Sequence, residues 1–298
     1  MLEAVEISHT FYAGTPFSRQ VLRKVQLRLA PGEVLLLTGP SGSGKTTLAR
    51  ICAGLVKPAR GSIRLHGVDI HGAGAGALSA GVRPLLVCQY PERQFFAKTV
   101  WDELSWGLRV GLGMAPEEIA NRLHLIAESL AFPLEELAKR SPKSLSSGQQ
   151  RKVALASLLV LEPRILILDE PLAGLHARER QRVISLLRQW AGHNRTMLII
   201  AHELELFLDW VEKVAVMDRG ELVFCGSPDE LCQATDRMVR HAASLPVTVE
   251  LSFFLKQSGL SPGPITTDQS IVHRQLREAL TKNKGECIHS PKREPSVT

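Results

Sequence analysis

The sequence predicts an α/β fold with three parts: a core of buried parallel strands, an N-terminal antiparallel β layer, and an inserted α-helical subdomain. Residues 4–7 and 25–29 alternate apolar and polar side chains, as strands with one buried face do. The apolar runs at 34–37 and 165–168 are typical of strands buried on both faces. Between residues 99 and 134 the apolar residues recur at helical spacing, so helices interrupt the strand pattern there.

Length and composition are those of a globular protein with a substantial core. The chain has 298 residues, of which 44% are hydrophobic and 22% charged. No apolar run approaches the roughly 20 residues that a membrane-spanning helix needs, and the N-terminus lacks a basic segment followed by an apolar one. We therefore expect no signal peptide and a cytosolic location. The five cysteines are scattered and lack a C-x-x-C pair, which argues against a disulfide framework and a zinc site.

The formal net charge of +6 is compatible with nucleic-acid binding, contact with anionic lipid headgroups, or a solvated surface. The basic residues are spread along the sequence and do not cluster. We therefore favour the solvated surface and expect no direct binding of nucleic acid.

Residues 39–46 match the pattern G-x-x-x-x-G-K-[ST] at every position, between an apolar run and a helical pattern at 47–53. Glycines let backbone N–H groups turn inward around a polyphosphate, and the following helix points its positive end at the same anion. The sequence therefore predicts a phosphate-binding loop and a P-loop NTPase core. The residues expected to bind the nucleotide are Gly39, Pro40, Ser41, Gly42, Ser43, Gly44, Lys45, Thr46 and Thr47.

Within this loop, Lys45 is expected to reach the β- and γ-phosphates, and the Thr46 hydroxyl to ligate Mg²⁺. Upstream, Phe11 and Tyr12 precede a turn at 14–16, where an aromatic face could stack on adenine. We predict that Tyr12 does so; the alternative is that both rings belong to the core.

Four polar residues stand at the ends of predicted buried strands. The strands cover 84–88, 165–168 and 197–200, and the residues that follow them are Gln89, Asp169, Glu170 and His202. Because α/β sheets bind ligands at the carboxyl ends of their strands, these side chains are candidates for one site shared with the loop. Two further runs, at 214–217 and 221–224, predict a closing hairpin.

The patterns also predict a division of the chain. Residues 1–235 form the main domain, with the helical subdomain at about 90–160. Residues 236–280 form a small C-terminal extension, and the polar stretch 281–298 is expected to be disordered.

The order of these motifs resembles the nucleotide-binding subunit of ABC transporters over residues 1–235. Segments similar to that family's Walker A, Q-loop, signature, end of Walker B and switch histidine follow one another at 39–46, Gln89, 145–149, 169–170 and His202. The resemblance implies an ATPase that uses ATP and Mg²⁺.

The resemblance also implies a role for each polar residue. Thr46, Gln89 and Asp169 would hold Mg²⁺. Glu170 would be the general base that polarises the attacking water, and His202 would contact the γ-phosphate.

The segment similar to the signature consists of Leu145, Ser146, Ser147, Gly148 and Gln149. By resemblance, the signature of one subunit closes on ATP held by another, with Ser146 and Gly148 meeting its γ-phosphate, so a dimer with a second ATPase subunit is implied. Because no membrane span is predicted, the resemblance further implies integral membrane transporter subunits as partners. The chain would then be a peripheral protein on the cytoplasmic face of the cell membrane.

A narrower resemblance, to energy-coupling factor (ECF) ATPases, is carried by residues 89–96 and 99–104. The tail is similar at 245–246 and 263–267, which extends the likeness to about residue 280. It implies an ATP-hydrolysing subunit that powers import of a vitamin or a transition-metal ion, but the chain does not identify the substrate. Residues 90–96 would face the membrane partner through Phe95 and Phe96; alternatively, both rings are core residues.

Two positions depart from the family pattern. Ser147 replaces the first glycine of the signature, where a side chain would be strained if the backbone had a positive φ. His176 stands in the D-loop, where the family carries an aspartate, and this puts the usual contacts across the dimer in doubt. Two alternatives therefore stay open: a weakly hydrolysing regulatory partner in a heterodimer, and a soluble ABC protein not linked to transport.

Overall fold

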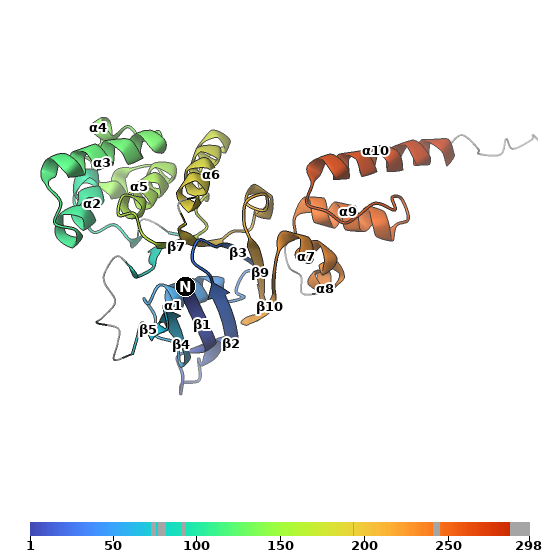
Figure 1. The fold of residues 1–298 in the computed structure, drawn as a ribbon, viewed down its shortest axis with the longest axis horizontal. Coiled ribbons are helices and arrows are strands. Elements are labelled where there is room, and N and C mark those ends of the chain that lie inside the picture. The colour runs from blue at the N-terminus through green and yellow to red at the C-terminus, as the bar shows by residue number, and fades with distance from the viewer. Residues whose placement is uncertain (73–75, 77–81, 91–92, 193, 241–244, 287–298) are drawn as a thin grey trace, which may run out of the picture.

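The computed structural model describes residues 1–72, 76, 82–90, 93–192, 194–240 and 245–286. Its strands form two sheets (Figure 1). The four-stranded sheet has the order β2-β1-β4-β5, with strands at Arg19–Leu29, Leu2–Phe11, Arg60–Leu65 and Val68–Asp69. The six-stranded sheet has the order β10-β9-β3-β8-β7-β6, with strands at Glu221–Gly226, Lys213–Asp218, Val34–Thr38, Thr196–Ile200, Ile165–Asp169 and Leu85–Val87.

The four-stranded sheet is the antiparallel layer that the alternating pattern predicts. Leu2 pairs with Leu29 and Ala4 with Leu27, and all four side chains are buried. Their polar neighbours point away from this face, because successive side chains of a strand alternate between the two faces. The predicted N-terminal layer is confirmed.

The six-stranded sheet is parallel from β6 to β9, and β10 closes one edge as an antiparallel hairpin with β9. Every residue of β3, β7 and β8 is buried, as their unbroken apolar runs predict. Because these strands are parallel, their carboxyl ends meet at one edge, where the candidate polar residues follow.

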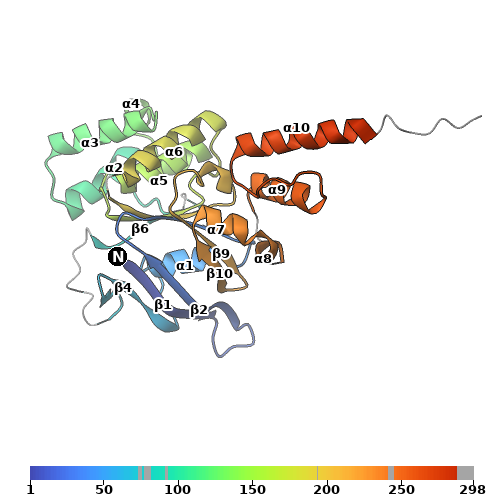
Figure 2. The same cartoon turned by 45° about the vertical axis from the view of Figure 1, so that its right-hand side comes forward.

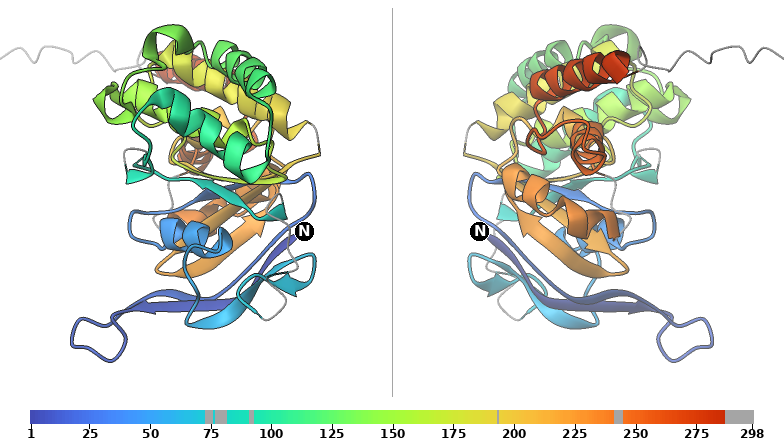
Figure 3. Two further views of the ribbon diagram at one scale, coloured as in Figure 1. Left: turned by 90° about the vertical axis from the view of Figure 1, so that its left-hand side faces the viewer. Right: turned by 90° about the vertical axis from the view of Figure 1, so that its right-hand side faces the viewer.

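The side chains of β3 divide the core into two layers. Val34 and Leu36 belong to a cluster beneath the large helices, whereas Leu35 and Leu37 belong to a cluster shared with the antiparallel sheet and helix α1 (Lys45–Cys52). Figure 3 shows the resulting stack of helices, parallel sheet, α1 and antiparallel sheet.

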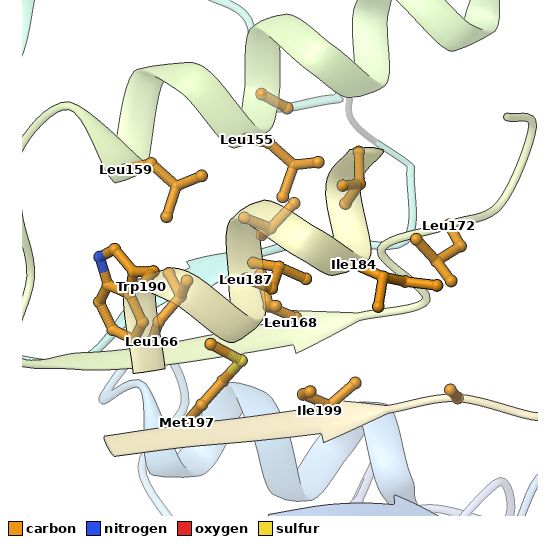
Figure 4. Close-up of a cluster of buried hydrophobic side chains, with 14 of the residues drawn as sticks. Leu155, Leu159, Leu166, Leu168, Leu172, Ile184, Leu187, Trp190, Met197 and Ile199 are labelled. Atoms are coloured by element: carbon orange, nitrogen blue, oxygen red, sulfur yellow. The ribbon is translucent and has the colours of Figure 1, made fainter. Parts of the chain in front are cut away.

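The inserted subdomain is helical, as the spacing of apolar residues predicts. It contains α2 (Val100–Trp106), a π-helical turn (Gly107–Gly111), α3 (Pro116–Ser129), α4 (Leu134–Leu137), a 3₁₀ turn (Pro142–Ser144) and α5 (Ser147–Leu159). Leu155 and Leu159 of α5 meet the next helix, α6 (Ala177–Ala191), above β7 and β8 (Figure 4). This shared cluster attaches the subdomain to the parallel sheet.

The C-terminal extension follows the β9–β10 hairpin. Its helices are α7 (Pro228–Gln233), α8 (Thr235–Arg240), α9 (Val247–Gln257) and α10 (Gln269–Glu286). Figure 2 shows α10 lying beside α9 at the side of the molecule. Leu245 and Val249 join the cluster beneath the large helices, so the extension packs on the main domain.

The last helix overlaps the stretch that the sequence analysis expects to be disordered. α10 continues to Glu286, past residue 281, where that stretch begins. Adding a residue to an existing helix costs little, so a polar segment extends a helix that it would not nucleate. Residues 287–298 lie outside the described part of the chain. Among the described residues, no helix combines the length and the apolar character that crossing a membrane requires.

Candidate functional site

The loop between β3 and α1 needs glycine at specific positions. Gly39, Gly42 and Gly44 have φ values of 138°, 79° and 106°, in the region that side chains disfavour. A Cβ on Gly39 would lie 2.0 Å from the carbonyl oxygen of Met217 in β9. At Gly39 the backbone thus approaches its neighbour too closely for any other residue, and α1 starts immediately after Gly44.

Lys45 fills the centre of this loop. Its side chain is buried, and Nζ donates to the carbonyl oxygens of Gly39, at 2.7 Å, and Pro40, at 3.0 Å. Burial lowers the pKa of the ammonium, while the charges of Glu170 and Asp169 oppose that shift. Lys45 therefore places a cation inside a ring of backbone groups.

Two carboxylates reach the same place from β7. Burial raises the pKa of Asp169, and a hydrogen bond from the Thr46 side chain opposes the shift. Burial, together with the charge of Asp169, raises the pKa of Glu170 to about 7. His202 follows β8, and its Nε2 lies 3.4 Å from Oε1 of Glu170. Burial lowers the pKa of His202, as does the charge of Lys45, which favours the neutral imidazole.

Five sequence-predicted residues thus come together at the carboxyl ends of β3, β7 and β8: Lys45, Thr46, Asp169, Glu170 and His202. The paired oxygens of Thr46 and Asp169 fit Mg²⁺, which prefers hard oxygen ligands and is commonly bound through one or two carboxylates plus phosphate oxygens. The described residues contain no cluster of three or more His, Cys, Asp and Glu side chains that could hold a metal without such help.

An aromatic cavity of about 380 Å³ opens beside the loop. Phe11, Tyr12, Phe17 and Arg19 line it together with Gly42, Gly44, Lys45, Thr46 and Thr47. Tyr12 is 72% exposed, so its ring is not a core residue. Sequence reasoning found Tyr12 but missed Phe17 and Arg19, which the turn between β1 and β2 brings back to the loop.

The signature begins α5. Ser146 caps the helix by accepting from the Gln149 backbone, and the Gln149 side chain accepts from the Ser146 backbone in return. Leu145 is buried. Ser147 is the first helical residue and does not have a positive φ, so the strain expected from its side chain does not arise. Gly148 is buried close to the carbonyl of Gly174, where a Cβ would lie 3.4 Å away.

Two basic residues next to the signature escaped sequence reasoning. Arg151 is 4% exposed, and it donates to the carbonyl oxygens of Cys88 (2.9 Å) and Gln89 (2.5 Å). Lys152 forms a 2.6 Å ion pair with Glu179 of α6. The available signal was a pair of charges in a helix that becomes apolar directly after them.

The D-loop is joined to the segment that contains His202. His176 is exposed at the start of α6, and its backbone N–H donates to Glu179. Arg180, one turn further on, donates to the carbonyl of Leu175 and to the carboxylate of Glu203. The backbone before His176 and the neighbour of His202 are therefore held by one side chain.

The two phenylalanines of the segment after Gln89 differ in exposure. Phe95 is 6% exposed and belongs to the core, so the expectation that both rings face outward is wrong for Phe95. Phe96 is 63% exposed and packs edge-on against Trp106, with ring centroids 5.2 Å apart. A cavity of about 220 Å³ lies between these rings and α5. Residues 91–92 lie outside the described part of the segment.

Comparisons with known proteins agree on one family. The family model described as ABC transporter matches residues 22–173. The energy-coupling factor transporter ATP-binding protein EcfA2 of Symbiobacterium thermophilum is 33% identical to this chain, over 94% of the chain and 96% of its own length. The EcfA2 protein of Thermotoga maritima is 34% identical over 79% and 86%, respectively.

A solved structure extends the match to three dimensions. It is that of cbiO1 from Clostridium perfringens, described as part of the ABC transporter complex cbiONQ. Its sequence is 27% identical, and the superposition covers 87% of this chain and 98% of the other with a TM-score of 0.65.

Proposed function

This chain belongs to the ABC transporter family and, within it, to the ECF ATP-binding proteins, and we propose that it is the ATP-hydrolysing subunit of an ECF-type importer. The observation that carries the proposal is the meeting of Lys45, Thr46, Asp169, Glu170 and His202 at one edge of the parallel sheet. ATP occupies the loop, with its phosphates on Lys45 and its base in the aromatic cavity beside Tyr12.

Mg²⁺ would be held by Thr46, Asp169 and Gln89, and when bound it supplies positive charge that neutralises the phosphate oxygens. The hydrolytic step is carried by the chain's own residues. Glu170 accepts a proton from the attacking water, and its raised pKa makes it a stronger base than an exposed carboxylate. The neutral imidazole of His202 lies beside that carboxylate, with Nε2 3.4 Å from Oε1 of Glu170, and it contacts the γ-phosphate from there. Lys45 stabilises the charge that develops on the phosphate oxygens.

Two subunits are needed for a complete site. The chain contains one phosphate loop and one signature, and the signature lies on α5 of the helical subdomain, on a different element from the loop. We therefore place Leu145, Ser146, Ser147, Gly148 and Gln149 against ATP held by a second ATPase subunit. α5 starts at this segment, so the positive end of its helix dipole faces that surface and favours an anion.

The second subunit is best provided by a related chain that keeps an aspartate in its D-loop. His176 is exposed where the family carries that aspartate, and an imidazole lacks the carboxylate charge that would attract Lys45 of the partner subunit. A homodimer would lack this attraction at both ATP sites and a heterodimer at one.

We expect His176→Asp to strengthen ATP-driven dimerisation of the purified chain about 30-fold. An opposite-charge contact near 4 Å contributes about 1 kcal/mol in water, and a homodimer gains two of them, while 1.4 kcal/mol corresponds to tenfold in affinity. Sedimentation measures dimerisation and phosphate release measures ATP turnover, with His124→Asp, an exposed histidine of α3, as the matched control. The heterodimer is wrong if the unmodified chain alone dimerises and hydrolyses ATP well and the substitution changes neither property.

The membrane subunits dock where Phe96 and Trp106 are exposed over the cavity against α5. The segment at this site connects Gln89 to the helical subdomain. A change in the position of Gln89 at the ATP site is therefore transmitted to the docked membrane subunit. The chain is then a peripheral protein on the cytoplasmic face of the membrane.

We expect a cysteine at Arg93 to crosslink to an integral membrane subunit in the detergent-solubilised complex, because Arg93 is exposed three residues before Phe96. Cys225 and Cys287 are replaced by serine to remove background. A cysteine at the exposed Gln20, on the antiparallel sheet, is the control and should give no such product. Mass spectrometry of the product identifies the partner; equal labelling from both positions would contradict docking at this cavity.

A further inference from the structure

We propose that Arg151 is a positioning residue for Gln89, fixing the backbone from which the Gln89 side chain reaches Mg²⁺. The inference rests on the proposed function, which places Gln89 at the metal. It means that α5, the helix that the signature begins, binds the Q-loop backbone directly.

The geometry of two hydrogen bonds carries the proposal. Nη1 of Arg151 donates to the carbonyl of Cys88 and Nη2 to the carbonyl of Gln89. These carbonyls belong to the two peptide planes on either side of the Gln89 Cα atom. Because the orientations of these planes set φ and ψ of Gln89, one guanidinium fixes the direction in which its Cα–Cβ bond points.

The surroundings make this hold rigid. Arg151 is almost fully buried, so water does not compete for its N–H groups. The preceding residues are fixed from the other side by Gln94, whose amide donates to the carbonyl of Leu86 and accepts from the backbone N–H of Cys88. The backbone on which Gln89 sits is therefore held from α5 and from its own loop.

Arginine suits this task better than lysine. A guanidinium presents two N–H groups in a planar fork that matches two neighbouring acceptors, whereas an ammonium is a single point charge on a flexible stem. The guanidinium also connects Gln89 to α5, the helix that starts with Ser147. In the proposed function the start of this helix faces the ATP that the second subunit holds. The position of the Q-loop backbone thus follows the position of the signature helix.

The test compares Arg151→Met, Gln89→Ala and the double variant. The first readout is the factor by which Mg²⁺ tightens binding of a non-hydrolysable ATP analogue, measured by calorimetry. We expect Arg151→Met to lower this factor about tenfold, as loss of a residue that orients a metal ligand does. In the Gln89→Ala background the same change should have less than about a twofold effect, because residues that act through one another are not additive.

The second readout needs neither nucleotide nor metal. Amide hydrogen exchange of the peptide spanning residues 86–90 should accelerate about tenfold in Arg151→Met. Arg122→Met is the matched control, since Arg122 of α3 also donates to a backbone carbonyl, that of Val160, but does not touch the Q-loop. It should leave both readouts unchanged.

Arg151→Lys separates positioning from simple charge, and it also serves if the methionine variant does not fold. It keeps the positive charge but loses the fork, so we expect both readouts to match Arg151→Met within about threefold. Wild-type values for Arg151→Lys, or additive effects in the double variant, would overturn the proposal. If Gln89→Ala leaves the Mg²⁺ factor unchanged, Gln89 does not bind the metal and the inference is wrong together with that part of the proposed function. If Gln89→Ala lowers the Mg²⁺ factor but Arg151→Met does not, the proposed function stands and only this inference is wrong.

Discussion

Glu170→Gln is expected to lower steady-state ATP turnover by about 10²- to 10⁴-fold while leaving ATP affinity within about threefold of the unmodified chain. The amide keeps the size of the side chain but cannot accept the proton of the attacking water. Asp169 and Thr46 are untouched, and Lys45 still meets the phosphates, so binding should persist. Phosphate release measures turnover, and calorimetry measures affinity.

The control for this variant is Glu128→Gln, which changes an exposed carboxylate of α3 in the same way. Its turnover should equal that of the unmodified chain. Because a weakly hydrolysing regulatory subunit would have little turnover to lose, the experiment also separates the proposed ATPase from that alternative. Near-normal turnover of Glu170→Gln would remove Glu170 from the catalytic role.

The parts of the fold that sequence predicted well are those in which a local pattern carries the information. The unbroken apolar runs in β3, β7 and β8 predict strands that are buried on both faces. The carboxyl ends of these strands lie at the edge of the sheet where the site forms. The phosphate loop is equally local, because its positive φ values at Gly39, Gly42 and Gly44 require glycine.

The parts that sequence missed depend on contacts between distant segments. Arg151 reaches carbonyls 63 and 62 positions earlier in the chain, and no local pattern encodes that reach. Phe95 and Phe96 are adjacent and identical, yet one is buried and the other exposed, since successive residues here point in different directions. Strain at Ser147 depended on a positive φ, and the sequence pattern did not show that Ser147 is the first residue of α5.

Lys45→Ala is expected to weaken ATP binding by about 100-fold or more. Removing one partner of a buried charge pair costs about 3 kcal/mol or more, and 1.4 kcal/mol corresponds to tenfold in affinity. Nζ also donates to the carbonyls of Gly39 and Pro40, so the substitution removes both the cation and the contacts that shape the loop.

Two measurements distinguish these losses. Calorimetry with ATP reports affinity, and thermal unfolding without nucleotide reports whether the loop still folds; we expect a large change in the first and a shift of only a few degrees in the second. Lys57→Ala removes an equal charge from an exposed position beyond α1 and should alter neither. Unchanged affinity in Lys45→Ala would show that the phosphates do not lie in this loop. Without them there, Thr46, Asp169 and Glu170 would have no phosphate to act on, and the proposed ATPase would lose its basis.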